Sequence, residues 1–172
     1  MFKRLRVFTQ ITLLGLTSSV MFACSDAGTT PATSQDSSTN TNFDLQLDMQ
    51  AFMNDVLEPV ADVLWDSAGW VDDIRTGYEE LYPETDEEWL LVKQKAAQLI
   101  EAGNALALPG RAVDNDGWIT YTNALSTAAA LAYRSAETQN QEDFFQAGAQ
   151  IYSVCTACHQ TYNPEISRFA SE

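Results

Sequence analysis

The sequence predicts an all-α protein, an antiparallel four-helix bundle, and three observations support this prediction. Apolar residues recur at steps of three and four in four separate stretches, which is the spacing of one helical face. Helix caps and helix breakers separate these stretches. No segment after residue 42 alternates apolar and polar residues over the length of a strand. Because the intervening loops are of modest length, neighbouring helices are expected to run antiparallel.

The first predicted helix covers residues 44–67 and is interrupted by a proline. Pro59 has no backbone N–H and its ring crowds the preceding turn, so we expect a kink near Asp55. Gly69 ends this helix. The segment that follows, which contains Gly77, is expected to form a loop.

The other three helices are predicted from their first and last residues. Thr85 and Glu88 form a capping box, and the second helix ends at residues 109–110, a Pro-Gly pair. The third helix begins after Gly117 and carries small alanines on one face. Asn140 is a suitable N-cap for the fourth helix, whose apolar face runs to the end of the chain.

The N-terminus predicts export followed by lipid anchoring. Residues 1–23 combine three cations with a short, interrupted apolar stretch, which suits a cleaved signal peptide better than a spanning helix. The junction before Cys24 resembles the lipobox of bacterial lipoproteins, in which the cysteine becomes acylated; the alternative is an ordinary signal peptide. Residues 24–42 hold no large apolar residue and are expected to be a flexible polar tether. Residues 43–172 then form one domain.

The charge of the chain limits its partners. The whole chain has a formal charge of −15, and removal of residues 1–23 with their three cations leaves −18. No basic stripe exists that could neutralise phosphates, so nucleic acid is excluded as a partner. The acidity predicts a protein partner with a basic docking surface. The competing interpretation is that the acidity only keeps the domain soluble.

The residues that carry chemistry are Cys155, Cys158 and His159, in the pattern Cys-x-x-Cys-His. On a helix the two thiols lie on roughly one face, spaced to form thioethers with the two vinyl groups of haem, and the histidine can then ligate the iron. We therefore predict one covalently bound haem c. A thioredoxin-type pair lacks its βαβ context, a zinc site lacks a fourth strong ligand, and a disulfide here would close too small a loop to stabilise much.

The position of this motif resembles one family of cytochromes. It lies on the last helix of a predicted bundle, as in the class II cytochromes c, the group of cytochrome c′ and cytochrome c556. Tyr162 in a Cys-His-x-x-Tyr pattern, Met53 in the first helix and the segment 108–112 are also similar to that group. The resemblance covers residues 43–172 and implies a haem c attached near the C-terminus of the last helix.

The resemblance also implies that the first helix supplies the distal haem ligand. The chain has a single histidine, so ligation by two histidines of one protomer is impossible. Met53 is the expected ligand, Met49 is the alternative one turn earlier, and either can instead be a packing residue. Arg111 is a candidate partner for a haem propionate, against the alternative of a surface arginine in a turn.

These observations predict an electron carrier and not an enzyme, because no carboxylate pair suited to acid–base catalysis is apparent. The expected function is one-electron transfer on the periplasmic side of a bacterial membrane, with the outer membrane slightly favoured. The alternatives are a five-coordinate protein that binds nitric oxide or carbon monoxide, and an accessory subunit of a larger membrane complex. The sequence leaves open whether the protein forms a homodimer.

Overall fold

The computed structural model describes residues 43–165, which are mostly helical, and confirms the all-α class. The first helix consists of three consecutive parts, α1 (Met49–Phe52), the π-helical η1 (Met53–Leu57) and α2 (Glu58–Asp66). A hairpin of β1 (Trp70–Asp73) and β2 (Gly77–Glu80) follows. The remaining elements are α3 (Asp86–Leu106), α4 (Gly117–Thr138) and α5 (Gln141–Tyr162).

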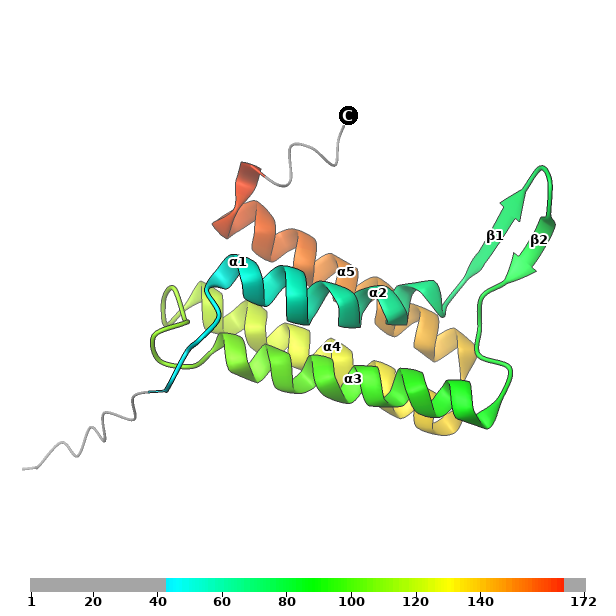
Figure 1. Ribbon diagram of the computed structural model, residues 1–172, viewed down its shortest axis with the longest axis horizontal. Coiled ribbons are helices and arrows are strands. Elements are labelled where there is room, and N and C mark those ends of the chain that lie inside the picture. The colour runs from blue at the N-terminus through cyan, green and yellow to red at the C-terminus, as the bar shows by residue number, and fades with distance from the viewer. Residues whose placement is uncertain (1–42, 166–172) are drawn as a thin grey trace, which may run out of the picture. The chain divides into compact units, whose positions relative to one another are not determined.

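The helices lie side by side with alternating chain direction (Figure 1). α3 packs along most of α4, α4 packs along α5, and α2 packs on α3 with a smaller contact to α5. One contiguous core fills the space between them. Its most buried large side chains are Phe144, Leu64, Leu99, Ile151 and Val92. No helix within residues 43–165 is both long enough and apolar enough to span a membrane.

The first helix is irregular at the place that the proline predicts. In a regular α-helix the N–H of residue 59 would donate to the carbonyl of Asp55, but Pro59 has no N–H and its ring clashes with that carbonyl. The chain instead forms the wider π-turn η1, in which the N–H of Glu58 donates to the carbonyl of Met53. The interruption that Pro59 predicts is therefore present as a π-turn, while the kink itself stays a prediction.

The predicted caps are present. The side chain of Thr85 accepts from the N–H of Glu88, and the Glu88 carboxylate accepts from the N–H of Thr85 at 3.0 Å. The side chain of Asn140 accepts from the N–H of Asp143 at 3.0 Å and begins α5. α4 starts at Gly117 itself, one residue before the predicted start.

The segment expected to be a loop forms the antiparallel hairpin of β1 and β2. All eight strand residues are exposed, so neither face of the hairpin is packed on a core. A strand alternates apolar and polar residues when one of its faces is buried and the other is exposed to solvent. Both faces of this hairpin are exposed, so its sequence does not need to alternate. The prediction that the segment has no regular structure was therefore wrong.

Candidate functional site

Cys155, Cys158 and His159 lie together in the C-terminal part of α5. Their spacing of three and four residues places them on one side of the helix, and all three side chains are half-buried. Both cysteines are free thiols, so no disulfide joins them. The structure thus presents the two sulfur atoms and the imidazole as one compact group at the end of a rigid helix.

The surroundings of the two thiols keep them protonated. Burial, and to a lesser degree the neighbouring Cys158, raises the pKa of Cys155 to about 11. Burial also raises the pKa of Cys158. A reactive redox pair needs a lowered thiol pKa, so this environment is the opposite of a thioredoxin-type site. Among residues 43–165, no group of three His, Cys, Asp or Glu side chains could hold a metal ion without further ligands.

Contact between the first helix and α5 is confined to one end of the pair. The indole N–H of Trp65 in α2 donates to the carbonyl of Gly148 at 3.1 Å, and its ring packs edge-on against Tyr152. In the described part of the chain, no Cα atom of α1 or η1 lies within 8 Å of an α5 Cα atom. Figure 1 shows α5 diverging from the first helix towards its C-terminal end. The two helices therefore separate where the cysteines lie.

Met53 lies at about the same axial level as His159, across this separation. The two helices run antiparallel from the contact between Trp65 and Gly148. Met53 lies 12 residues before Trp65 and His159 lies 11 residues after Gly148. At about 1.5 Å per residue, both displacements are about 16–18 Å in the same direction. The fold thus brings residues more than 100 positions apart to one end of the helices.

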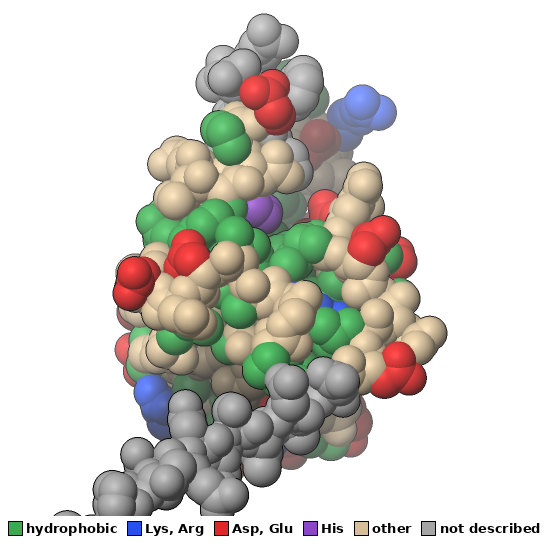
Figure 2. All heavy atoms as spheres, turned by 90° about the vertical axis from the view of Figure 1, so that its left-hand side faces the viewer, with side chains coloured by type: hydrophobic (Ala, Val, Ile, Leu, Met, Phe, Trp, Pro, Cys, Tyr) green, Lys and Arg blue, Asp and Glu red, His purple; other side chains and the backbone are tan. Residues whose placement is uncertain are grey.

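The surfaces that border this separation are apolar and only half-buried. On the first helix Met49, Met53 and Val56 contact the core from its edge, and on α5 Val154 and Cys155 do the same. The imidazole of the single histidine, purple in Figure 2, is flanked by hydrophobic side chains. A half-buried apolar surface around a ligating side chain suits a flat hydrophobic group.

Arg111 lies in the loop between α3 and α4, at this same end of the helices. Its guanidinium lies 4.0 Å from the centroid of the Phe52 ring and donates to the carbonyl of Leu47 at 3.4 Å. Within residues 43–165 no carboxylate forms an ion pair with Arg111. Among these residues the charge of this half-buried cation is therefore not balanced by a direct acidic contact.

The sequence analysis missed a contact that fixes the end of α5. The hydroxyl of Tyr162 donates to the Asp114 carboxylate at 2.5 Å, and its ring packs edge-on against Trp118. The other oxygen of Asp114 accepts from the backbone N–H groups of Asp116 and Trp118. Asp114 thus accepts a hydrogen bond from the first turn of α4 although the N-cap is Asp116, and an Asp two residues before an Asp-Gly pair could have indicated that role.

These interactions have opposite effects on the two ionisable groups. The hydrogen bond from Tyr162, followed by those from the backbone, lowers the pKa of Asp114. The same carboxylate raises the pKa of Tyr162 to about 12. The pair therefore holds the last turn of α5 over the start of α4 at neutral pH.

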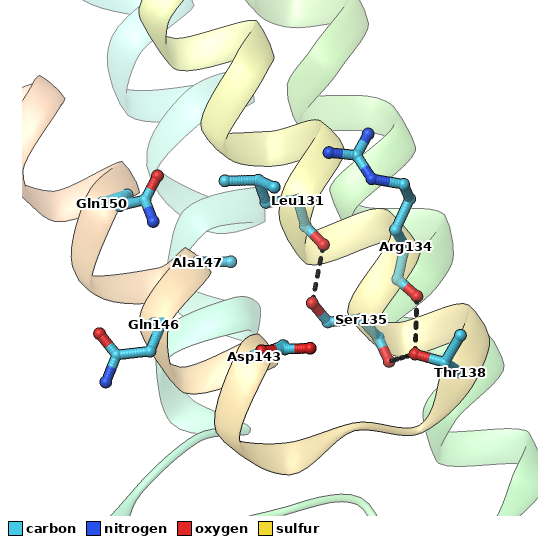
Figure 3. A pocket seen from close by; sticks show the side chains of 8 residues that line it. All are labelled: Leu131, Arg134, Ser135, Thr138, Asp143, Gln146, Ala147 and Gln150. Atoms are coloured by element: carbon cyan, nitrogen blue, oxygen red, sulfur yellow. Dashed lines mark hydrogen bonds between the residues drawn. The ribbon is translucent and has the colours of Figure 1, made fainter.

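Two cavities in the described chain lie away from the cysteines. The cavity in Figure 3 has a volume of about 390 Å³ and lies between α4 and the N-terminal half of α5, at the opposite end of the helices. The hydroxyls of Ser135 and Thr138 donate to carbonyls of α4. The second cavity, about 400 Å³, lies between β2 and the start of α3.

Two further predictions fall outside the described residues. These are Cys24 with its preceding signal segment 1–23 and tether, and the part of the fourth predicted helix beyond residue 165. No protein-family model matches the chain, and comparisons with curated proteins and with solved structures find no significant match.

Proposed function

We propose that the protein is a monohaem c-type cytochrome built as an antiparallel four-helix bundle, and that it carries single electrons between extracytoplasmic partners. One observation carries this proposal. Cys155, Cys158 and His159 form a half-buried group on α5, at the level where the first helix separates from α5 and presents Met53. This arrangement supplies two thiols, a proximal ligand and a distal thioether from a single small domain.

The donor set fits the chemistry of haem c. Cys155 and Cys158 would hold the haem: each thiol would add across one vinyl group, sulfur to one carbon and hydrogen to the other, so that two thioethers would form without loss of an atom. His159 follows Cys158 directly, and its imidazole nitrogen would ligate the iron. The bound haem supplies the one-electron couple between ferric and ferrous iron.

Met53 is the proposed distal ligand. Its half-buried side chain lies on the inner edge of the first helix, and its axial level matches that of His159. Thioether sulfur is a soft neutral ligand that stabilises ferrous iron, which suits an electron carrier. Met49 lies one turn further from the contact between Trp65 and Gly148 and is the second candidate.

Arg111 is the proposed partner of a haem propionate. Its guanidinium has no direct acidic partner within residues 43–165, and Phe52 holds it at the end of the helices that carries the motif. A planar cation with free donors binds a carboxylate strongly in a partly buried site. The net charge of the chain further supports a redox partner with a basic docking surface.

We propose that acylated Cys24 anchors the domain to the periplasmic face of a membrane. A polar segment of 18 residues, 25–42, connects this cysteine to the domain. This tether would let the domain move near the membrane surface. The intact mass of the purified protein tests this: it should correspond to a chain that starts at Cys24 and carries added lipid, and Cys24→Ala should release the domain in soluble form. A chain of unmodified mass, or one with another first residue, contradicts the anchor.

Visible spectra of the oxidised and reduced protein test the haem proposal. Covalent haem should survive denaturation, and Cys155→Ala with Cys158→Ala should abolish its retention. The wild type should be low-spin in both states. Met53→Ala should give a high-spin spectrum that responds to carbon monoxide, while Met49→Ala should leave the spectrum unchanged.

The same spectra distinguish the alternatives. If the wild-type protein is already high-spin and binds carbon monoxide, the proposed function changes from an electron carrier to a gas-binding protein. A spectral change in Met49→Ala alone moves the distal ligand by one turn. Failure of the wild type to incorporate haem in a host that matures c-type cytochromes refutes the proposal.

A further inference from the structure

The hairpin of β1 and β2 is a preformed structure outside the core. Its turn is fixed by the Asp73 carboxylate, which accepts from the N–H groups of Arg75 at 2.7 Å and Thr76 at 3.3 Å, and by the positive φ of Gly77. Its base is closed by a backbone hydrogen bond from Leu81 to Gly69. Trp70 stacks on Phe145 of α5, with the ring centroids 6.1 Å apart, and attaches the hairpin to the helices. Figure 1 shows it projecting from them.

The hairpin holds large apolar side chains in water. Trp70 is 59% exposed, Tyr78 is 62% exposed and Ile74 at the tip is 100% exposed. With Val71, these make four of the ten exposed large hydrophobic residues of the described chain, although the hairpin spans only residues 70–80. Such a concentration marks a contact surface, because isolated exposed hydrophobics need no explanation but a cluster does.

The pairing across the hairpin mixes apolar and acidic side chains. Trp70 pairs with Glu80, Val71 with Glu79, and Tyr78 with Asp72. None of these pairs is of the aromatic, β-branched or opposite-charge kinds that stabilise a hairpin. Each face instead presents an apolar group beside a carboxylate. With Asp73 and the single cation Arg75, residues 70–80 have a net charge of −3.

We infer that the hairpin is a docking arm for a protein partner whose surface alternates basic and apolar side chains. Such a surface matches each apolar–acidic pair of the hairpin, burying the apolar member and neutralising the carboxylate. The cavity between β2 and α3 also combines acidic and apolar side chains. It is lined by Glu79, Glu80 and Glu88 together with Leu81 and Leu91. The hairpin also leaves both strand edges without a partner within residues 43–165.

The docking arm is separate from the proposed haem site. It lies at the end of the helices where α3 and α5 begin, whereas the cysteines lie near the end of α5. From Phe145, the α5 residue that Trp70 contacts, to Cys155 is 10 residues, or about 15 Å of helix. The arm therefore serves assembly with a second protein rather than electron entry, and the inference does not depend on the presence of haem.

The chemistry disfavours two other occupants. A second copy of this chain would bring carboxylates of one hairpin against those of the other, which repel each other. A membrane with anionic headgroups would repel the same carboxylates. A basic protein surface meets both the apolar and the charged part of the arm.

Site-specific photo-crosslinking of the full-length, membrane-attached protein in the cells that make it tests this inference. A diazirine amino acid at Ile74 should give an adduct with one other protein, and the crosslinked peptide should lie among Lys or Arg residues. The matched control is the same probe at Val113, which is 60% exposed but lies in the loop between α3 and α4. It should not capture that protein.

Affinity measured with the purified captured protein provides the second readout. Ile74→Ser should weaken binding by about tenfold or more, because a fully buried isoleucine would be lost from the contact. Its complete exposure in the free protein means that folding is unaffected. Glu79→Gln with Glu80→Gln should slow association and flatten its salt dependence. Val113→Ser should leave binding unchanged.

The inference is overturned if the Ile74 probe captures only lipid, only a second copy or no partner. It is also overturned if the captured surface lacks basic residues, or if Val113→Ser weakens binding as much as Ile74→Ser. The visible spectrum of Ile74→Ser should equal that of the wild type. The spectrum therefore reports loss of haem, and the binding measurement reports loss of docking.

Discussion

Replacing Trp118 with phenylalanine removes one hydrogen bond and leaves its acceptor without a partner. The Trp118 side chain is 3% exposed, and its indole N–H donates to the carbonyl of Leu106 at 2.8 Å. Leu106 is the last residue of α3, so its carbonyl is one of the four that the helix itself cannot satisfy. The interaction therefore caps α3 from within the core.

The decrease in stability comes from the unsatisfied carbonyl and from the smaller ring. Leaving a buried carbonyl unsatisfied costs about 1–3 kcal/mol, and the smaller ring leaves unfilled volume that adds about 1 kcal/mol. We expect Trp118→Phe to lower the free energy of unfolding by about 3 kcal/mol. For about 120 ordered residues this corresponds to a decrease in Tm of about 12 °C.

Trp65→Phe is the matched comparison, because it removes the same indole N–H from a different kind of acceptor. Its acceptor, Gly148, lies within α5, where the carbonyl also accepts the regular helical hydrogen bond. The lost hydrogen bond should then cost about 1 kcal/mol, and the smaller ring should cost less than at Trp118 because Trp65 is only half-buried, so the total should stay below about 2 kcal/mol. Urea denaturation of both variants, followed by circular dichroism, measures the two costs. Equal costs would refute the argument that the acceptor's second partner determines the penalty.

Two further predictions concern ionisation and capping. Because its hydrogen bonds lower the pKa of Asp114, this group stabilises the fold above the ordinary Asp pKa of about 3.9 and loses that contribution as pH falls through the lower folded-state value. Asp114→Asn should reduce the acid sensitivity of unfolding, and the ultraviolet titration of Tyr162 should move from about 12 towards 10.0; an unchanged titration would contradict the contact. Tyr162 itself stabilises the fold below pH 10 and loses that contribution as pH rises through about 12. Thr85→Ala should lower the free energy of unfolding, measured in urea, by about 1 kcal/mol. Thr85→Ser should retain most of the wild-type stability, because only the hydroxyl caps α3.

Features with local causes could be predicted from the sequence. The cap at Thr85 depends on residues three apart, and the irregularity before Pro59 depends on one missing N–H. The grouping of Cys155, Cys158 and His159 on one side of α5 follows from helical spacing alone.

Features with long-range causes could not be predicted in the same way. The bond between Asp114 and Tyr162 joins residues 48 positions apart, and no periodicity relates them. The hairpin lacked a sequence pattern because both of its faces meet water.

The π-turn changes how positions on the two sides of it should be compared. A hydrogen bond from residue i+5 rather than i+4 accommodates one extra residue in the turn, and one residue corresponds to about 100° of rotation around a helix. Counting back from Val60 to Met49 in steps of three and four residues therefore places Met49 on a helix face that is wrong by one position. An alignment of this chain with a protein whose first helix is regular requires a one-residue gap within Met53–Leu57. Without that gap, Met49 and the other residues before the turn would be aligned with the wrong positions of that protein.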